Sequence, residues 1–317
     1  MTGASGDSYN TPMPVPLVYL NGRFIPFHKA ALPLNDAGFV SGATVVDNAR
    51  TYRRRLFRWA DHLARFRRDC EACFVPLPAT DAGVTAAAEE LVARNAALLP
   101  PGEELHLVTF ATPGPLGFYL GVHDTGPPTL GLVTYPLPID RYRPFFTEGV
   151  SLAVVGHLPA DPDALVPPRV KHRSRLAWWV ADRRPRPPGT VAIVTDRPGG
   201  TLTETGVANF LAVFDGVVTT PPRAKILDGI SLRVVEELCG TLGIPFGEQE
   251  IPSATAPRMS EAFLAGTGFG LAGVRRIDGT TVPWPGPVFR RLLAAWSDAV
   301  GVDVEGQFVG GLVRPLA

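Results

Sequence analysis

The segment 228–245 constrains the fold more than any other stretch of the chain. Residues 230–242 carry apolar side chains at helical spacing, which predicts an amphipathic helix. Gly229 stands before this helix, and Gly243 follows it in the usual C-terminal manner. Free N–H groups, a glycine and the Ser231 hydroxyl at the helix start predict a phosphate-binding site. Simple capping of the helix by a Ser or Asp side chain is the alternative.

Predicted strands and helices are interspersed along the rest of the chain. Asn21-Gly22 between two short apolar runs predicts a tight β-hairpin, because both central turn residues need positive φ. Other helices are expected at 60–73, 84–98, 175–183 and 288–300. Other strands are expected at 44–52, 56–58, 105–111, 129–134, 150–155, 191–194, 209–214, 217–219 and 262–265.

A segment with several prolines, 135–144, has the composition of a linker and is taken as a domain boundary. We therefore expect a small N-terminal domain over 17–140 and a larger domain over 141–317. Residues 1–16 are rich in Gly, Ser, Thr and Pro and lack the basic start and apolar centre of a signal peptide. They are expected to form a disordered tail.

Charge and cysteine content exclude several functional classes. The 30 Lys and Arg residues are balanced by 30 Asp and Glu residues, so no basic excess favours nucleic acid or a membrane surface as partner. The sequence has no apolar run of about 18 residues that would span a membrane. Three cysteines form no disulfide framework, which indicates a reducing cytoplasm. Cys70 and Cys73 share a helical stripe with apolar residues, so we interpret them as core side chains rather than a redox pair.

Any reactive amine must be one of three lysines, Lys29, Lys171 and Lys225. Lys171 lies just past a Pro-Pro pair and close to Val170 and two tryptophans. A lysine near apolar neighbours loses its charge more readily, and a neutral amine is what forms a Schiff base. An exposed lysine on a loop is the alternative interpretation.

Glu204 and the segment Gly266-Thr267-Gly268 are two further candidate site features, and each is a weak indication by itself. Glu204 lies in an extended run before a small-residue turn, where a buried carboxylate would keep a ring nitrogen protonated; a solvated or capping Glu is the alternative. Gly266-Thr267-Gly268 follows a short apolar strand and allows close approach of a ligand to the backbone. A dinucleotide site is disfavoured there, because the nearest acid, Asp278, comes too early for a ribose ligand. The histidines show no metal-ligand spacing, so no metal is expected.

The order of these parts is more specific than each part alone. The sequence contains, in order, Tyr19-Leu20-Asn21-Gly22, Asp47-Asn48-Ala49-Arg50, His62-Leu63-Ala64-Arg65, Lys171, Glu204, Ala208-Asn209-Phe210, Thr220-Pro221-Pro222, Ile226-Leu227-Asp228-Gly229-Ile230-Ser231 and Ala265-Gly266-Thr267. From about Val18 to Val282 the chain thereby resembles the class IV aminotransferases, the fold-type IV pyridoxal-phosphate enzymes. That family includes branched-chain and D-amino-acid aminotransferases and 4-amino-4-deoxychorismate lyase.

The resemblance implies a fold and a set of roles. A small N-terminal α/β domain and a larger β-rich domain would hold pyridoxal 5'-phosphate between them, in a homodimer. Lys171 would form the Schiff base and move a proton between the substrate Cα and the cofactor, and Glu204 would pair with the pyridine nitrogen. The phosphate and ring contacts would come from Arg65, Leu227, Gly229, Ile230, Ser231 and Thr267. Asp47 and Gly268 would lie on the substrate side.

The departures from the family concern the substrate. Asp47 stands where the family usually has Glu, and strand 105–111 lacks the carboxylate-binding arginine of several members. Leu176 sits near the place of a tyrosine in branched-chain enzymes, while Lys171-His172-x-x-Arg175-Leu176 is similar to the lyases. We expect transfer of an amino group from an apolar amino acid to a 2-oxo acid, with pyruvate-releasing lyase activity as the alternative. A non-catalytic relative is disfavoured, because both Lys171 and Glu204 are present.

Overall fold

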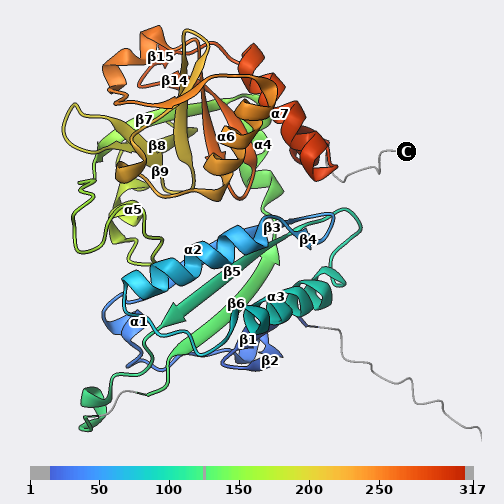
Figure 1. The fold of residues 1–317 in the computed structure, drawn as a ribbon, viewed down its shortest axis with the longest axis vertical. Helices are drawn as coiled ribbons and strands as arrows, with labels where there is room; N and C mark the ends of the chain where they lie inside the picture. Colours follow the sequence, from blue (N-terminus) through green and yellow to red (C-terminus); the bar gives the residue numbers. More distant parts are fainter. Residues whose placement is uncertain (1–14, 124–125, 311–317) are drawn as a thin grey trace, which may run out of the picture.

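The computed structural model describes residues 15–123 and 126–310 and arranges them as two domains, one above the other in Figure 1. The tail expected at 1–16 lies outside the described residues except for Val15 and Pro16. The mixed α/β fold class is confirmed, and each domain is built on its own sheet. No helix in the described ranges is long and apolar enough to cross a membrane.

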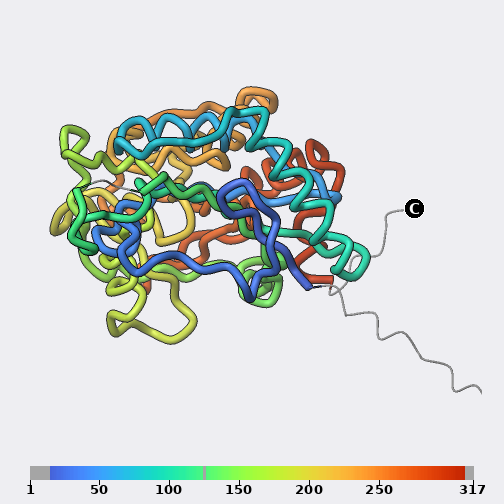
Figure 2. The backbone as a smooth tube through the Cα atoms, turned by 90° about the horizontal axis from the view of Figure 1, so that it is seen from below, coloured from blue at the N-terminus to red at the C-terminus, as the bar shows by residue number. Residues whose placement is uncertain are grey.

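The small domain contains a six-stranded sheet of order β2-β1-β6-β5-β3-β4. Two long helices, α2 and α3, bury apolar side chains against one face of this sheet and lie beside it in Figure 2. The predicted hairpin is confirmed, with Asn21 and Gly22 both at positive φ. The elements are β1 (Leu17–Leu20), β2 (Arg23–Pro26), α1 (Ala37–Val40), β3 (Val45–Tyr52), β4 (Arg55–Leu56), α2 (Trp59–Ala72), α3 (Asp81–Ala96), β5 (Leu105–Thr112) and β6 (Thr129–Pro136), with 3-10 turns at Phe27–Lys29 and Gly117–Leu120.

The large domain contains a nine-stranded sheet that runs β12-β11-β10-β13-β14-β7-β8-β9, with β15 paired to β14. β9 also pairs with β10 through Glu204 and Asn209, so part of the sheet closes on itself. The elements are α4 (Ile139–Thr147), β7 (Val150–His157), α5 (Leu176–Ala181), β8 (Thr190–Thr195), β9 (Leu202–Thr205), β10 (Asn209–Phe214), β11 (Val217–Thr220), α6 (Ile230–Leu242), β12 (Phe246–Glu248), β13 (Glu261–Gly266), β14 (Gly270–Ile277), β15 (Thr280–Thr281), α7 (Pro287–Val300) and α8 (Val304–Val309), with 3-10 turns at Arg223–Lys225 and Ser253–Arg258.

The main correction to the sequence analysis concerns the segment 135–144. The linker prediction is wrong, because β6 runs to Pro136 and α4 begins at Ile139. Pro144 inside α4 removes one helical hydrogen bond, but Tyr142 and Phe146, four residues apart, are both buried in the large core. The burial of Tyr142 and Phe146 stabilises the helix by more than Pro144 destabilises it. The expected boundary after residue 140 falls inside α4, and its position stays a prediction.

Candidate active site

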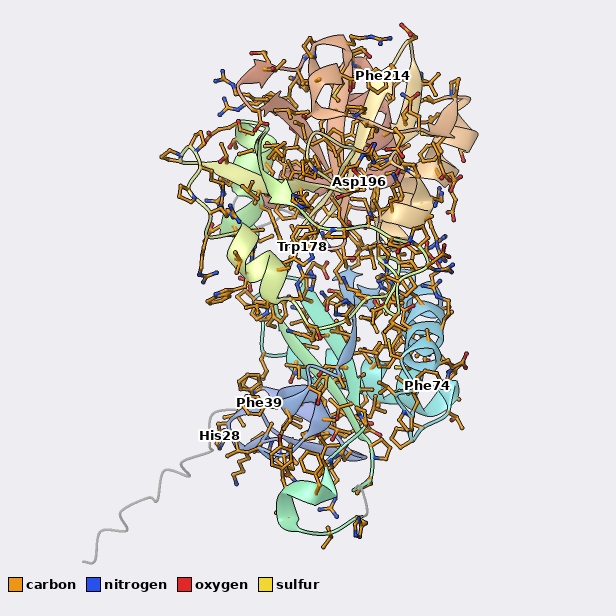
Figure 3. All side chains as sticks on the ribbon, turned by 90° about the vertical axis from the view of Figure 1, so that its left-hand side faces the viewer. His28, Phe39, Phe74, Trp178, Asp196 and Phe214 are labelled. Atoms are coloured by element: carbon orange, nitrogen blue, oxygen red, sulfur yellow. The ribbon has the colours of Figure 1, made fainter. Side chains whose placement is uncertain are left out.

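One pocket brings together every residue expected to contact the cofactor. Its walls include Arg65 from α2, Lys171 before α5, Glu204 on β9, Thr267 after β13, and the start of α6 with Leu227, Gly229, Ile230 and Ser231. Trp178 of α5 also lines the pocket, and Figure 3 shows it at the level where the two domains meet. Segments from both domains, far apart in the sequence, therefore meet at one place.

The start of α6 forms one end of the pocket. Gly229 occupies the N-cap position, and no side chain within the described ranges caps the first turn. The first-turn N–H groups of Ile230 and Ser231 therefore keep their capacity to bind an anion. A Cβ at Gly229 would overlap the amide oxygen of Asn209, so glycine is needed here for close packing rather than for an unusual φ.

Arg65 is held rigidly at the same end. Its Nε and Nη2 donate to the two carboxylate oxygens of Asp47, at 2.8 and 3.0 Å, and its Nη1 donates to the carbonyl of Asp228 at 2.7 Å. His62 lies 2.7 Å from Asp47 through Nδ1. Burial would raise the pKa of Asp47, but Arg65 and His62 outweigh it and hold the pKa well below its usual range. A guanidinium has five N–H groups, so two remain for a ligand.

Lys171 is fixed to the small domain by its main chain. Its carbonyl accepts from Val46 N at 3.0 Å, its N–H donates to Asp69 Oδ2 at 2.9 Å, and His172 bridges to Val45 of β3. The side chain is half-buried. Burial, followed by the positive charge of Arg65, lowers the pKa of Lys171 to about 8. The amine is therefore much closer to neutrality at physiological pH than an ordinary lysine.

Glu204 faces the same space from the seam where β9 meets β10. One carboxylate oxygen accepts from Leu227 N at 3.2 Å and from Asn209 Nδ2 at 3.3 Å. Asn209 also donates to the carbonyl of Leu227 at 3.0 Å, which ties the strand seam to the loop before α6. Burial raises the pKa of Glu204 to about 7, against the opposing effects of the Leu227 N–H and of Lys171. A carboxyl group so placed stabilises a positive charge on a partner that binds beside it.

The turn after β13 closes the remaining side of the pocket. A Cβ at Gly266 would lie 2.9 Å from the carbonyl of Val207, so the backbone approach here requires glycine. The Gly268 carbonyl accepts from Arg50 Nη1 at 3.3 Å, and Tyr142 of α4 packs against the same glycine. The segment that the sequence analysis took for a linker thus supports this turn.

Two predicted substrate residues do not line the pocket. Both carboxylate oxygens of Asp47 are occupied behind Arg65, and Gly268 lies one residue beyond the lining Thr267. The sequence analysis missed Arg68 and Asp69, which contact the loop before α6 and Lys171. Their spacing of three and four residues from Arg65 places all three on one helical face, a signal that was available in the sequence.

The cysteine and metal predictions concern neighbouring regions. Cys70 is buried in the small-domain core, Cys73 packs against that core, and both are free thiols, so the interpretation as core side chains is confirmed. Burial raises the pKa of both thiols. In the described part of the chain, no group of three His, Cys, Asp or Glu side chains is arranged to hold a metal ion.

The donor set fits a phosphorylated carbonyl cofactor. An uncapped helix start and Arg65 suit the phosphate, the amine of Lys171 suits a carbonyl, and Glu204 suits a protonated ring nitrogen. A lysine of lowered pKa in such a pocket has the properties of an activated amine nucleophile.

Comparison with known proteins identifies the family. Residues 44–277 match the amino-transferase class IV family, so the chain belongs to that family. It is 27% identical over 271 residues to a putative branched-chain-amino-acid aminotransferase of Methanocaldococcus jannaschii, covering 84% of this chain and 89% of the relative. It is 25% identical over 283 residues to D-alanine aminotransferase of Staphylococcus aureus strain COL, covering 87% and 94%. Its activity is therefore that of a class IV aminotransferase.

Solved structures confirm the fold. Branched-chain amino acid aminotransferase of Escherichia coli superposes with a TM-score of 0.79 at 21% identity, over 95% of this chain and 97% of that one. 4-Amino-4-deoxychorismate lyase of Pseudomonas aeruginosa gives 0.72 at 23% identity, over 89% and 98%. Another branched-chain amino acid aminotransferase structure contains pyridoxamine 5'-phosphate, with a TM-score of 0.77 at 20% identity over 95% and 98%. The family depends on pyridoxal phosphate, and so does this enzyme.

Proposed function

We propose that this enzyme moves an amino group from an amino acid with an apolar side chain to a 2-oxo acid, and that Lys171 is the lysine that bonds to the cofactor. The observation that supports this best is the convergence of Lys171, Glu204 and the start of α6 on one pocket. Bound pyridoxal phosphate would supply an aldehyde carbon that condenses with the substrate amine, with loss of water, and a ring that withdraws electrons from the substrate Cα.

The residues of the phosphate end bind and orient. The N–H groups at the start of α6 and the helix dipole stabilise an anion by about 0.3–1 kcal/mol, and by up to about 2 kcal/mol where partly buried. Arg65 adds charge-assisted hydrogen bonds through its two remaining N–H groups. Ser231 and Thr267 border the same space and supply hydroxyl groups.

Lys171 and Glu204 handle protons at two ends of the reacting system. With a pKa lowered to about 8, the amine of Lys171 is suited to remove a proton from the substrate Cα and return it. Glu204 holds a proton at the ring nitrogen through its carboxylate, whose position is fixed by the Leu227 N–H. Leu227 and Trp178 are apolar walls that exclude water from the reacting atoms.

The substrate class rests on the relatives. The two relatives are named for branched-chain amino acids and for D-alanine, whose side chains are apolar. A panel of L- and D-amino donors tests this, with the cofactor spectrum as readout. Apolar donors added alone should convert the cofactor to pyridoxamine phosphate, and Lys171→Ala should abolish that conversion. No spectral change with any donor would contradict the proposal.

A lyase is the second candidate, and Leu176 favours it. This residue, in the place of the branched-chain tyrosine, is 75% exposed and does not line the pocket, whereas Arg175 does. The similarity to a solved 4-amino-4-deoxychorismate lyase extends over 89% of the chain. A lyase would release pyruvate from aminodeoxychorismate without any amino acceptor, so a pyruvate assay with and without 2-oxoglutarate separates the two reactions.

We also propose a cytoplasmic homodimer. Phe118, Tyr119 and Leu120 form an exposed apolar group on the small domain, and their exposed fractions are 66%, 54% and 73%. Contiguous apolar side chains of this kind usually mark a protein contact. Three free thiols suit a reducing compartment. Sedimentation of the holoenzyme should give twice the mass of 33.9 kDa, and a monomer at micromolar concentration would contradict the dimer.

A further inference from the structure

Asp69 is a buried acid that contacts the main chain of the proposed cofactor lysine. Its side chain is 1% exposed. One oxygen accepts the N–H of Lys171 at 2.9 Å, and the other accepts from Arg68 through Nη2 at 2.9 Å and Nε at 3.1 Å. Both oxygens are therefore directed at fixed partners rather than at the space of the pocket.

Arg68 connects Asp69 to Asp228, in the loop before α6. Its Nη1 donates to Asp228 Oδ2 at 2.8 Å, and Asp228 also accepts from Arg233 in the first turns of α6. The carbonyl of Asp228 accepts from Arg65, one helical turn before Arg68 on α2. A single face of α2 thus holds both the lysine segment and the loop that leads into α6.

We propose that Asp69 and Arg68 are positioning residues, which hold the main chain of Lys171 at a fixed distance from the anion-binding start of α6. The proposal rests on the proposed function, because this spacing matters only if Lys171 bonds to a cofactor whose phosphate lies at α6. Asp69 and Arg68 act through Lys171 and Asp228 rather than through a contact with the ligand.

The location of Lys171 explains why its main chain needs an additional contact to fix its position. The lysine lies in the long connection between β7 and α5, outside any strand or helix. A flexible side chain reaches a fixed carbonyl reproducibly only if its own Cα is held in place. The largest charge effects on the amine come from Arg65, Asp47, Arg175 and Glu204. Asp69 contacts Lys171 at its main-chain N–H, so we expect it to act through the position of the main chain.

The test compares two probes on the full-length cofactor-free protein. Pyridoxal phosphate condenses with the lysine amine, with loss of one water, and the absorbance reports the bond. Pyridoxine 5'-phosphate carries an alcohol in place of the aldehyde, so it reports the phosphate and ring contacts alone. The variants are Asp69→Ala, Asp69→Asn and Arg68→Gln. Arg67→Gln is the matched control, since Arg67 pairs with the exposed Asp81 on the other side of α2.

Asp69→Ala should lower the rate of condensation by roughly 10- to 100-fold, the usual consequence of a misplaced reacting group. Binding of pyridoxine 5'-phosphate should stay within about 3-fold, the scatter of a change distant from the ligand. Asp69→Asn keeps an acceptor for the Lys171 N–H and should recover most of the rate. Arg68→Gln should show an intermediate loss, and Arg67→Gln none.

Two results would overturn the proposal: condensation in Asp69→Ala as fast as in the unchanged protein, or an equal loss in the binding of both probes, which would indicate general damage to the pocket. If Asp69→Ala fails to fold, an unchanged condensation rate in Arg68→Gln would overturn it equally. Failure of the unchanged protein to condense with pyridoxal phosphate would instead contradict the proposed function.

Discussion

The large-domain wall of the pocket presents groups with spare binding capacity, whereas the small-domain wall is built on the fully paired carboxylate of Asp47 and keeps two N–H groups of Arg65 for a ligand. On the large-domain side, α6 begins without a side-chain cap within the described chain, and Glu204 has a raised pKa of about 7. On the small-domain side, Asp47 is saturated by His62 and Arg65, and its pKa is strongly lowered. The large-domain wall can bind a ligand directly, whereas the hydrogen bonds of Asp47 hold Arg65 of the small-domain wall in place. Replacement of Glu204 should therefore affect mainly the chemistry, and replacement of Asp47 should affect mainly the stability.

Lys171 bridges the two walls, and its replacement should have the largest effect. Lys171→Ala removes the group proposed to move the Cα proton, so kcat should fall by about 10²- to 10⁴-fold or more. Lys29→Ala is the control, because Lys29 is exposed on the small domain and should leave kcat near its original value. Steady-state transamination kinetics check this. Similar activity in both variants would contradict the assignment.

Asp47 tests the paired wall. Asp47→Ala leaves the buried Arg65 charge without its partner, which should lower the free energy of unfolding by about 3–5 kcal/mol. The matched control is Asp61→Ala on the same helix as Arg65, whose partially exposed pair with Arg58 should cost less than about 1 kcal/mol. Urea unfolding of the cofactor-free proteins measures both. Equal losses of unfolding free energy in Asp47→Ala and Asp61→Ala would contradict the proposal that the buried pair of Asp47 stabilises the small-domain wall.

Glu204 tests the ligand-ready wall. Glu204→Gln cannot hold a positive ring nitrogen, so kcat should fall by roughly 10²- to 10³-fold, as when a preorganised electrostatic group is lost. Below pH 4.5, where the carboxyl group is protonated in both the folded and the unfolded state, its free energy of unfolding should change little, in contrast to Asp47→Ala. A normal kcat together with a large loss of stability in Glu204→Gln would contradict the assignment of Glu204 to the chemistry of the site.

The pH dependence of stability provides a second measurement on Glu204. Burial raises its pKa from 4.5 to about 7 in the folded, cofactor-free protein. The folded state then binds the proton more tightly than the unfolded state, so the contribution of Glu204 to stability is present at low pH and falls as pH rises from 4.5 to about 7. Glu204→Gln should remove this slope. An unchanged slope would show that other groups produce it.

Ser231 should give the smallest effect. Ser231→Ala removes one hydroxyl from the anion site but leaves the α6 N–H groups, so the Kd for pyridoxal phosphate should rise by roughly 2- to 10-fold. The control is Ser297→Ala, whose hydroxyl bonds Leu293 within α7, distant from the pocket. Fluorescence titration measures both. A loss of about 100-fold or more would show that the main-chain groups contribute less than proposed.

The two walls also differ in how far they were predictable from the sequence. The start of α6 was predictable because local sequence determines where a helix begins, and Gly229 stands at its N-cap. The spacing of Asp69 from Arg65 places it on the same helical face, but its partner, the Lys171 N–H, is 102 residues away, and no local pattern identifies that partner. α4 was missed because the burial of Tyr142 and Phe146 overrides Pro144, and burial against distant strands is a tertiary effect. The site as a set was predictable only through the order of its motifs.

The most direct test of the account is chemical. Borohydride reduction of the coloured holoenzyme fixes the cofactor on the lysine that carries it, and peptide mapping then locates the modified residue. We expect the phosphopyridoxyl group on Lys171 alone, in a peptide that also contains His172. A label on Lys29 or Lys225, or no label at all, would contradict the account.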